Sequence, residues 1–260
     1  METRRYDMPA VFGPSLLPER SVVRASVATA SFKTTKEAAQ SLLPRFFQAA
    51  EQPTVTLSRI TYSGVDYLGG RQYQELVVGV SAIYAYGDLR IEANFAPVLW
   101  VDEAAALVAG REFQGLAKLH GTFAPLEIGR DTVSFDCSEY DAIFLRATAG
   151  GLKPLSASRL ESMRAAFSEV RTLGWKYIPG LEGRPDADYP TLSVMRWEYD
   201  EAWSGESVVE FETPCATQAP FSARVAAALK GLPVVERGRA FVGRGQATID
   251  RSATKRLPFE

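Results

Sequence analysis

Alternating apolar and polar residues dominate the first half of the chain. Residues 21–32 and 54–62 place an apolar side chain at nearly every second position, which is typical of a β-strand with one buried face. Residues 72–95 continue this pattern on both sides of a Gly-Asp pair at positions 87–88. Such a pair between two alternating runs predicts a β-hairpin. This half of the chain is therefore predicted to be mainly sheet.

Four segments show helical spacing instead. The clearest is residues 156–174, where Ser158 and Glu161 fit a capping box and Gly174 ends the pattern. Its apolar positions recur every three or four residues, which predicts one buried face; they are Leu160, Met163, Phe167, Val170 and Leu173. The other predicted helices are residues 34–48 with a capping box of Thr34 and Glu37, residues 103–109, and residues 220–229 between Pro220 and Gly231.

The second half of the chain adds further strands without a strand–helix rhythm. The predicted strands are residues 98–101, 116–123, 132–137, 142–149, 175–178, 192–199, 208–212 and 240–249. Many strands with few helices predict an α+β fold whose sheet is mostly antiparallel. We expect a single domain over residues 1–260, in which residues 1–20 form an extended arm. Residues 179–190, rich in Gly, Pro and Asp, are a candidate surface loop or lid.

Composition narrows the functional classes. The chain has 260 residues, of which 46% are hydrophobic and 23% charged, and a net charge of -2. These values are ordinary for a globular protein and argue against nucleic acid as a partner, because phosphate binding needs clustered Lys and Arg. Two cysteines and one histidine suggest neither a disulfide framework nor a metal site. With no apolar run of membrane-spanning length, we expect a cytoplasmic location.

One lysine stands among apolar residues in the stretch 101–123. Lys118 lies between Ala117 and Leu119 and follows Leu116. It is either a surface residue whose stem covers an apolar patch or a buried amine. Burial disfavours the charged form of an amine, and a neutral amine is a nucleophile toward ketones. Lys118 is therefore a candidate catalytic residue.

The residues around Lys118 resemble the acetoacetate decarboxylase superfamily. Gly110-Arg111-Glu112, six residues before the lysine, is similar to the G-R-E triplet that precedes the Schiff-base lysine of that superfamily. Three further elements follow the superfamily's order; they are Tyr73-Gln74-Glu75, the segment Glu201-Ala202-Trp203-Ser204-Gly205, which resembles a turn of the superfamily, and Leu232-Pro233-Val234 with Glu236. The resemblance implies a cone-shaped β-barrel core with flanking helices, assembled as a homo-oligomer.

The resemblance also implies a set of site residues. Lys118 is expected to form the Schiff base, with Glu75 as the acid or base and Tyr73, on the same strand face, assisting proton transfer. Gln114, four residues before Lys118, is a candidate ligand of a substrate oxygen. The other candidate substrate-binding residues are Arg24 (or Arg20) as a carboxylate clamp, Arg111, which either braces its loop or contacts substrate, and His120, which either faces the cavity or lies at the surface.

Two departures from the decarboxylase pattern favour a different reaction. The decarboxylases carry a second lysine where this chain has Leu119. They also carry a second glutamate on the strand before the Gly-rich turn, where this chain has Arg59 and Ile60. The superfamily includes members that form a Schiff base with pyruvate and catalyse aldol condensation and dehydration. The presence of a glutamine, Gln114, near the lysine resembles that branch.

We therefore expect a lysine Schiff-base lyase on small oxo acids, favouring condensation of pyruvate with an aldehyde. Decarboxylation of acetoacetate or another 3-oxo acid on the same lysine is the alternative. A non-catalytic protein that binds a small acid in the same pocket is a second alternative. We expect no cofactor, because the chain has no phosphate loop and no Gly-rich dinucleotide turn.

Overall fold

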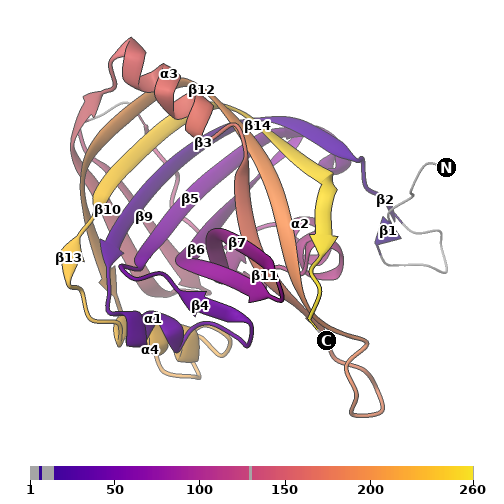
Figure 1. Cartoon of the computed structure of the whole chain (residues 1–260). Coiled ribbons are helices and arrows are strands. Elements are labelled where there is room, and N and C mark those ends of the chain that lie inside the picture. The colour runs from indigo at the N-terminus through magenta and orange to yellow at the C-terminus, as the bar shows by residue number, and fades with distance from the viewer. Residues whose placement is uncertain (1–5, 8–14, 129–130, 260) are drawn as a thin grey trace.

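The fold is built almost entirely from β-strands. The structure, a computed structural model, describes residues 6–7, 15–128 and 131–259 (Figure 1). Its strands are β1 Tyr6–Asp7, β2 Ser15–Leu16, β3 Arg20–Lys33, β4 Phe47–Ala49, β5 Thr54–Val65, β6 Arg71–Tyr86, β7 Leu89–Val101, β8 Lys118–His120, β9 Val133–Glu139, β10 Ala142–Pro154, β11 Val170–Ile178, β12 Ala187–Phe211, β13 Glu236–Arg237 and β14 Arg239–Arg256. Its α-helices are α1 Lys36–Gln40, α2 Ala104–Ala109, α3 Ala157–Ala166 and α4 Ala223–Lys230.

Seven strands of one large sheet close on themselves. Their order is β11-β7-β6-β5-β3-β14-β12, and β11 also pairs with β12. The far half of the long strand β12 then pairs with β10, which pairs with β9. Almost all of these pairings are antiparallel; β11–β7 and β7–β8 are parallel. The predicted α+β class with a mostly antiparallel sheet is confirmed. We expected the sheet to form a cone-shaped barrel, but only seven of its strands form the closed ring.

The strands that alternated in sequence lie where they were predicted. β3, β5, β6 and β7 are neighbours in the ring, and β6 and β7 form the predicted hairpin. Gly87 in its turn has a φ of +54°, a conformation that favours glycine. One face of these strands packs into the main apolar core with β9, β10 and α4. The other face lines the interior of the ring.

The helix predicted over residues 156–174 is wrong in its second half. The helix α3 ends at Ala166, and Val170 and Leu173 belong to strand β11. Leu173 is buried in a small core outside the ring, whereas no residue of α3 is buried. A spacing of three and four residues cannot reveal that these positions close the ring through pairing with β7 and β12, because this pairing is long-range. The N-cap is Ser156, which accepts a hydrogen bond from the Arg159 amide.

Two other sequence predictions need correction. The helix predicted over residues 34–48 is only α1, capped by Thr35, and residues 47–49 form β4. The segment Glu201–Gly205, expected as a turn, lies within β12. Gly205 is needed there because a Cβ would lie 2.2 Å from the Gly150 carbonyl oxygen. Most of the predicted arm 1–20 lies outside the described residues.

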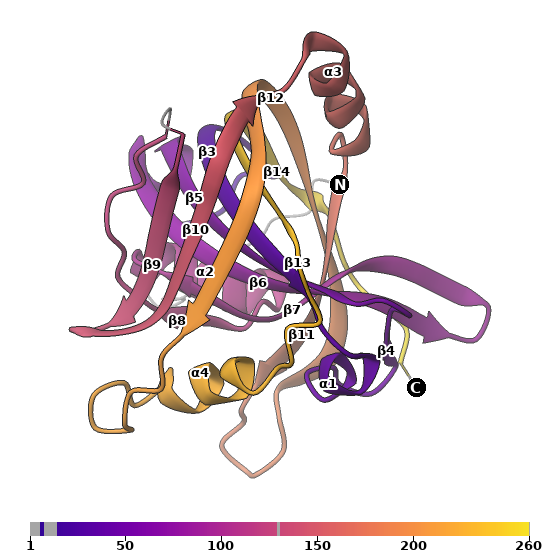
Figure 2. The ribbon, with the colours of Figure 1, turned by 90° about the vertical axis from the view of Figure 1, so that its left-hand side faces the viewer.

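The helices cover the two ends of the ring. Both views show α3 at one end, while α1 and α4 lie together at the other (Figures 1 and 2). The helix α3 is held to the sheet by Arg164, whose Nε donates to the Tyr199 carbonyl oxygen at 2.7 Å. None of the helices in the described part of the chain is long and apolar enough to cross a membrane.

Candidate active site

Strand β6 carries the acidic group of the site. Its residues alternate between the two faces of the sheet, so that Glu75 and Val77 line an internal cavity while Leu76 packs into the main core on the other face. The Glu75 side chain is buried, with 4% of its surface exposed. A buried carboxylate is costly without a partner, so its contacts determine what the site can do.

Lys118 is the partner of this carboxylate. The short strand β8 runs parallel to β7, with Lys118 opposite Leu99, and this pairing brings the lysine side chain alongside β6. Its Nζ lies 3.1 Å from Oε2 of Glu75, and only 4% of the Lys118 surface is exposed. The two residues are 43 positions apart in sequence. The structure thus joins the two residues predicted as catalytic in one buried contact.

Two tyrosines complete this cluster. The Tyr62 hydroxyl donates to Oε1 of Glu75 at 3.0 Å, and the Lys118 amine lies 5.8 Å from the centroid of the Tyr73 ring. Burial, and then the charge of Glu75, raise the pKa of both phenols well above the ordinary value. Both phenols therefore stay protonated, and Tyr62 acts as a hydrogen-bond donor to the carboxylate.

Gly110 leaves room for the lysine side chain. We predicted that the helical segment would end at residue 109. Instead, α2 continues directly into a π-helical turn, Gly110–Gln114. A Cβ on Gly110 would lie 2.5 Å from both Cδ and Cε of Lys118, closer than carbon atoms can approach. The first residue of the Gly-Arg-Glu triplet therefore has a steric role.

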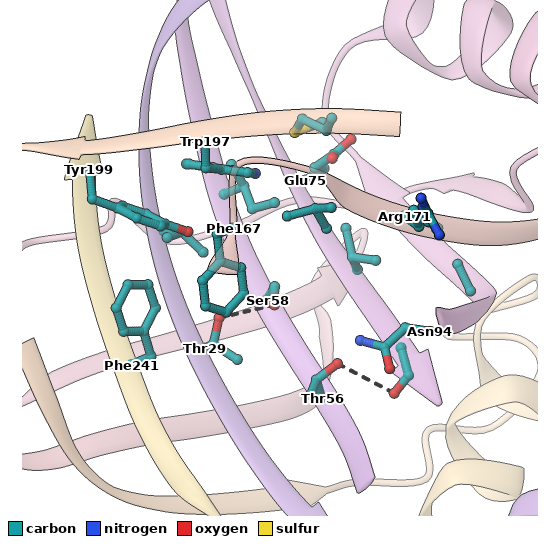
Figure 3. Close-up of a pocket in the computed structure, with 18 of the residues that line it drawn as sticks. Thr29, Thr56, Ser58, Glu75, Asn94, Phe167, Arg171, Trp197, Tyr199 and Phe241 are labelled. Carbon is teal, nitrogen blue, oxygen red and sulfur yellow. Dashed lines mark hydrogen bonds between the residues drawn. The ribbon is translucent and has the colours of Figure 1, made fainter. Parts of the chain in front are cut away.

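Beside this cluster lies a cavity of about 600 Å³. Figure 3 shows the aromatic side chains of Trp197 and Tyr199 on one side of Glu75 and the side chains of Arg171 and Asn94 on the other. Thr29 and Ser58, joined by a hydrogen bond of 3.0 Å, lie across from them. Lys118 does not line this cavity, but its amine contacts Glu75, which does. A substrate in the cavity would therefore meet the carboxylate first.

The residues predicted from the G-R-E segment occupy different places. Gln114 lines the cavity close to Leu116. Arg111 does not line it; its Nη1 donates to the Lys118 carbonyl oxygen at 3.2 Å. Of the two roles left open for Arg111, the structure shows bracing of the strand that carries the lysine.

Two other predicted binding residues lie away from the cavity. Arg24 is exposed and forms an ion pair of 2.8 Å with Asp200. His120 is exposed although it lies two residues from Lys118. Arg20, the alternative clamp, is paired with Asp250 at 3.3 Å. None of the three lines the cavity, so the structure gives no support to their assignment as substrate-binding residues.

Ile60 and Arg59, the residues expected in place of the second glutamate, face opposite sides of the sheet. Ile60 pairs with Glu75 across β5 and β6 and lines the cavity. Arg59 points to the opposite face, where it is fully buried and its guanidinium lies 4.1 Å from the centroid of the Phe123 ring. Burial lowers the pKa of Arg59 to about 10. The cavity thus has an apolar side chain opposite Glu75.

Two features of the site were not predicted from sequence. Tyr62 ends an alternating run, but nothing in that run distinguishes it from Ile60. The helix α3 contributes Arg159 and Met163 to the cavity wall, whereas the candidate lid of residues 179–190 contributes nothing to it. Within residues 6–7, 15–128 and 131–259, no three His, Cys, Asp or Glu side chains gather as metal ligands would.

A sequence model of the acetoacetate decarboxylase family matches residues 7–249. The chain belongs to the acetoacetate decarboxylase family. No curated protein matches it.

Solved structures of the acetoacetate decarboxylase family share this fold at low sequence identity. An acetoacetate decarboxylase from Legionella pneumophila is 19% identical with a TM-score of 0.70, and the match covers 96% of this chain and 92% of that one. An acetoacetate decarboxylase-like enzyme from Sphingomonas wittichii RW1 is 17% identical with a TM-score of 0.70, covering 96% and 98%. The enduracididine biosynthesis enzyme MppR, complexed with pyruvate, is 17% identical with a TM-score of 0.67, covering 96% and 95%.

The steric role of Gly110 predicts a specific stability effect. Replacing it with alanine should lower the free energy of unfolding by about 1–3 kcal/mol, as overpacking of a filled site does, because the new methyl group meets the Lys118 side chain. Urea unfolding measures this loss. Gly231→Ala is the matched control, since its Cβ would approach no atom closer than 3.4 Å.

The same loss in a Lys118→Ala background would contradict this explanation. With the lysine side chain removed, alanine at position 110 has space, and the cost of Gly110→Ala should largely disappear.

Proposed function

We propose that this protein is a lysine Schiff-base lyase acting on small oxo acids, and that it favours condensation of pyruvate with an aldehyde followed by loss of water. The observation that carries the proposal is the buried contact of 3.1 Å between Lys118 Nζ and Glu75 Oε2 beside a cavity. Membership of the acetoacetate decarboxylase family supports an enzymatic function, because the acetoacetate decarboxylases of this family are enzymes.

The contact supplies the two functions that imine chemistry requires. An amine attacks a carbonyl only when it is unprotonated. Moving one proton from Lys118 to Glu75 across their hydrogen bond converts a buried ion pair into a neutral amine and a neutral acid, without exporting charge from the site. The hydrogen bond from Tyr62 holds the carboxyl group in place during this exchange. Rotation of the lysine side chain then brings the amine past Glu75 to the cavity.

The proposed reaction balances as a condensation. The neutral Lys118 amine adds to the ketone of pyruvate, and the ketone oxygen leaves as water with the proton held by Glu75, which gives an iminium ion and restores the Glu75 carboxylate. Glu75 removes a proton from the adjacent methyl carbon, and the resulting enamine forms a carbon–carbon bond to the aldehyde, whose oxygen takes up a proton. Loss of that hydroxyl with a second proton as water gives the conjugated iminium. Hydrolysis consumes one water and releases the unsaturated oxo acid and the free lysine.

Three features favour condensation over decarboxylation. Ile60 faces Glu75 where the decarboxylases carry a second acid. Leu119, in place of the second lysine, packs against the main core and adds no charge to the site. The cavity of about 600 Å³ has the size of pockets that hold drug-sized ligands, which leaves room for an aldehyde beside pyruvate. MppR has also been solved with the condensation product of pyruvate and imidazole 4-carboxaldehyde.

Decarboxylation of a 3-oxo acid is the second candidate. It uses the same iminium ion, which accepts the electron pair of the breaking bond to CO2 and becomes an enamine. Its support is the similarity to solved acetoacetate decarboxylases over more than nine-tenths of this chain. In either reaction we assign Gln114, which lines the cavity, to the substrate carboxylate or carbonyl oxygen.

Reductive trapping tests the Schiff base directly. Borohydride added with pyruvate near neutral pH should attach one substrate-sized mass, and peptide mapping should place it on Lys118. Lys118→Ala should abolish the adduct. Lys118→Arg should abolish it as well, because a guanidinium stays protonated. Lys230→Ala, which removes an exposed lysine on α4, is the control and should trap normally.

An adduct on another lysine, or no adduct with several oxo acids, would overturn the proposal. The protein would then be assigned the remaining function, non-catalytic binding of a small acid in the cavity.

The choice of substrate separates the two reactions. We expect pyruvate with an aromatic aldehyde to give a conjugated oxo acid that absorbs in the near ultraviolet, and acetoacetate to be a poor substrate. The measurements are the ultraviolet absorbance of the first mixture and carbon dioxide release from the second. Fast carbon dioxide release, with no condensation product from a panel of aldehydes, would make decarboxylation the function.

A further inference from the structure

The charged side chains that line the cavity are unequal in number. In the described part of the chain they are one carboxylate and three guanidinium groups, and they belong to Glu75, Arg159, Arg171 and Arg239. The carboxylate already has the Lys118 amine as its partner, and Arg171 forms an ion pair of 2.7 Å with Glu169. The other two arginines form no ion pair with any described residue. The cavity therefore carries positive charge that no side chain neutralises.

These two arginines, Arg159 and Arg239, lie at the same end of the cavity. Arg239 is the first residue of β14, and its Nη2 donates to the Ser204 hydroxyl of β12 at 3.0 Å. The chain enters α3 beside the same part of β12, because the Leu155 amide donates to the Ala202 carbonyl oxygen at 2.9 Å. Arg159 follows Leu155 by about one helical turn. Since Arg159, Arg239 and Ser204 all line the cavity, we call these three residues its basic end.

The guanidinium of Arg239 has N–H groups to spare for a ligand. The register of β12 and β14 places Glu206 opposite Arg239, and opposite charges at such positions often pair. The guanidinium donates to the Ser204 hydroxyl instead, through Nε at 3.3 Å and Nη2 at 3.0 Å. A guanidinium has five N–H groups, so most of them remain available to an acceptor in the cavity.

An aromatic surface leads from the reactive carboxylate to the basic end. Tyr62, whose hydroxyl binds that carboxylate, lies 6.5 Å from Trp197 between ring centroids. Trp197 stacks on Tyr199 at 5.3 Å and 16°, and Tyr199 contacts Phe241 at 5.1 Å. Phe241 is two residues from Arg239 on β14, hence on the same face of the strand. Figure 3 shows the three rings after Tyr62 on one side of the reactive carboxylate.

The strand register gives the length of this path. Glu75 and Gly243 belong to one row of paired residues that crosses β6, β5, β3 and β14, which is roughly 14 Å across the sheet. Arg239 lies four residues from Gly243 along β14, which is roughly 13 Å along the strand. Pyruvate on Lys118 covers only the reactive end, so the basic end is available to the second substrate.

The chemistry of the basic end suits a carboxylate on an aromatic body. Guanidinium groups bind carboxylates through charge-assisted hydrogen bonds, and the Ser204 hydroxyl adds a polar contact. No carboxylate of the described cavity lining competes there, because Glu75 is bound to Lys118 at the other end. The aromatic surface between the two ends favours flat rings.

We propose that Arg159 and Arg239 bind a carboxylate at the far end of an elongated aromatic aldehyde whose carbonyl carbon reacts at Lys118. This inference rests on the proposed function and deepens it, because it assigns the second substrate to the aromatic aldehydes that carry a remote carboxylate. Arg159 and Arg239 are then specificity-determining residues.

Two ligands of the same shape test this assignment without requiring any reaction. The probes are biphenyl-4-carboxylate and biphenyl-4-carboxamide, neither of which forms an imine. Calorimetric titration of the intact protein near neutral pH should give a dissociation constant roughly tenfold lower for the carboxylate, as expected for a charge-assisted hydrogen bond. Arg159→Gln and Arg239→Gln should each lower this ratio, and the double variant should bring it close to one.

Arg224→Gln is the matched control. Arg224 is an exposed arginine of α4 that does not line the cavity, so its replacement removes the same charge from the protein and should keep the tenfold ratio. Circular dichroism verifies that each variant is folded, and a methionine variant replaces any glutamine variant that is not.

Four results would overturn the inference. They are a ratio near one in the unchanged protein, an undiminished ratio in the double variant, an equal loss in Arg224→Gln, and binding of neither ligand. An equal loss in Arg224→Gln would show that the ratio reports the net charge of the protein instead of a site.

The result is independent of the borohydride experiment. A protein that traps pyruvate on Lys118 but has a ratio near one contradicts only the basic end. A protein that does not trap pyruvate but has a tenfold ratio, lost in the double variant, contradicts only the Schiff-base chemistry.

Discussion

A buried amine in contact with a buried carboxylate constrains the rest of this structure. Lys118 and Glu75 are each only 4% exposed, and each would be costly to bury alone. The sheet must therefore hold the two side chains 3.1 Å apart even though they come from strands far apart in sequence. The hydrogen bond from Tyr62 and the space left by Gly110 both serve this one contact.

The same contact links the fold to the proposed chemistry. A proton can pass between the two groups without a net change of charge in the site, so the amine can become nucleophilic while it remains buried. Because Glu75 both contacts the amine and lines the cavity, the carboxylate is also placed to meet the substrate carbon that loses a proton. The ring of strands supplies this cavity.

The sequence predicted individual strands better than the strand pairings that close the sheet into a ring. Alternation revealed β3, β5, β6 and β7, because each has one face in a core and the other in the cavity. It misassigned Val170 and Leu173 to a helix, since their strand is defined by partners distant in sequence. Lys118 and Glu75 were found through short motifs. Arg24 was chosen because the resemblance implies an arginine near the N-terminal strand, and His120 because it lies two residues beyond Lys118; neither reason determines the direction of a side chain. Tyr62 carries no such signal.

A double-mutant cycle on the buried contact tests the central claim most directly. The free energies of unfolding of the unchanged protein, Lys118→Met, Glu75→Gln and the double variant are compared by urea denaturation. Each single change should cost about 3–5 kcal/mol because it leaves a buried group without its partner. The double variant should lose about 1–3 kcal/mol less than the sum of the two. Losses that add to within about 0.5 kcal/mol would show that Lys118 and Glu75 are not coupled, and would contradict the account.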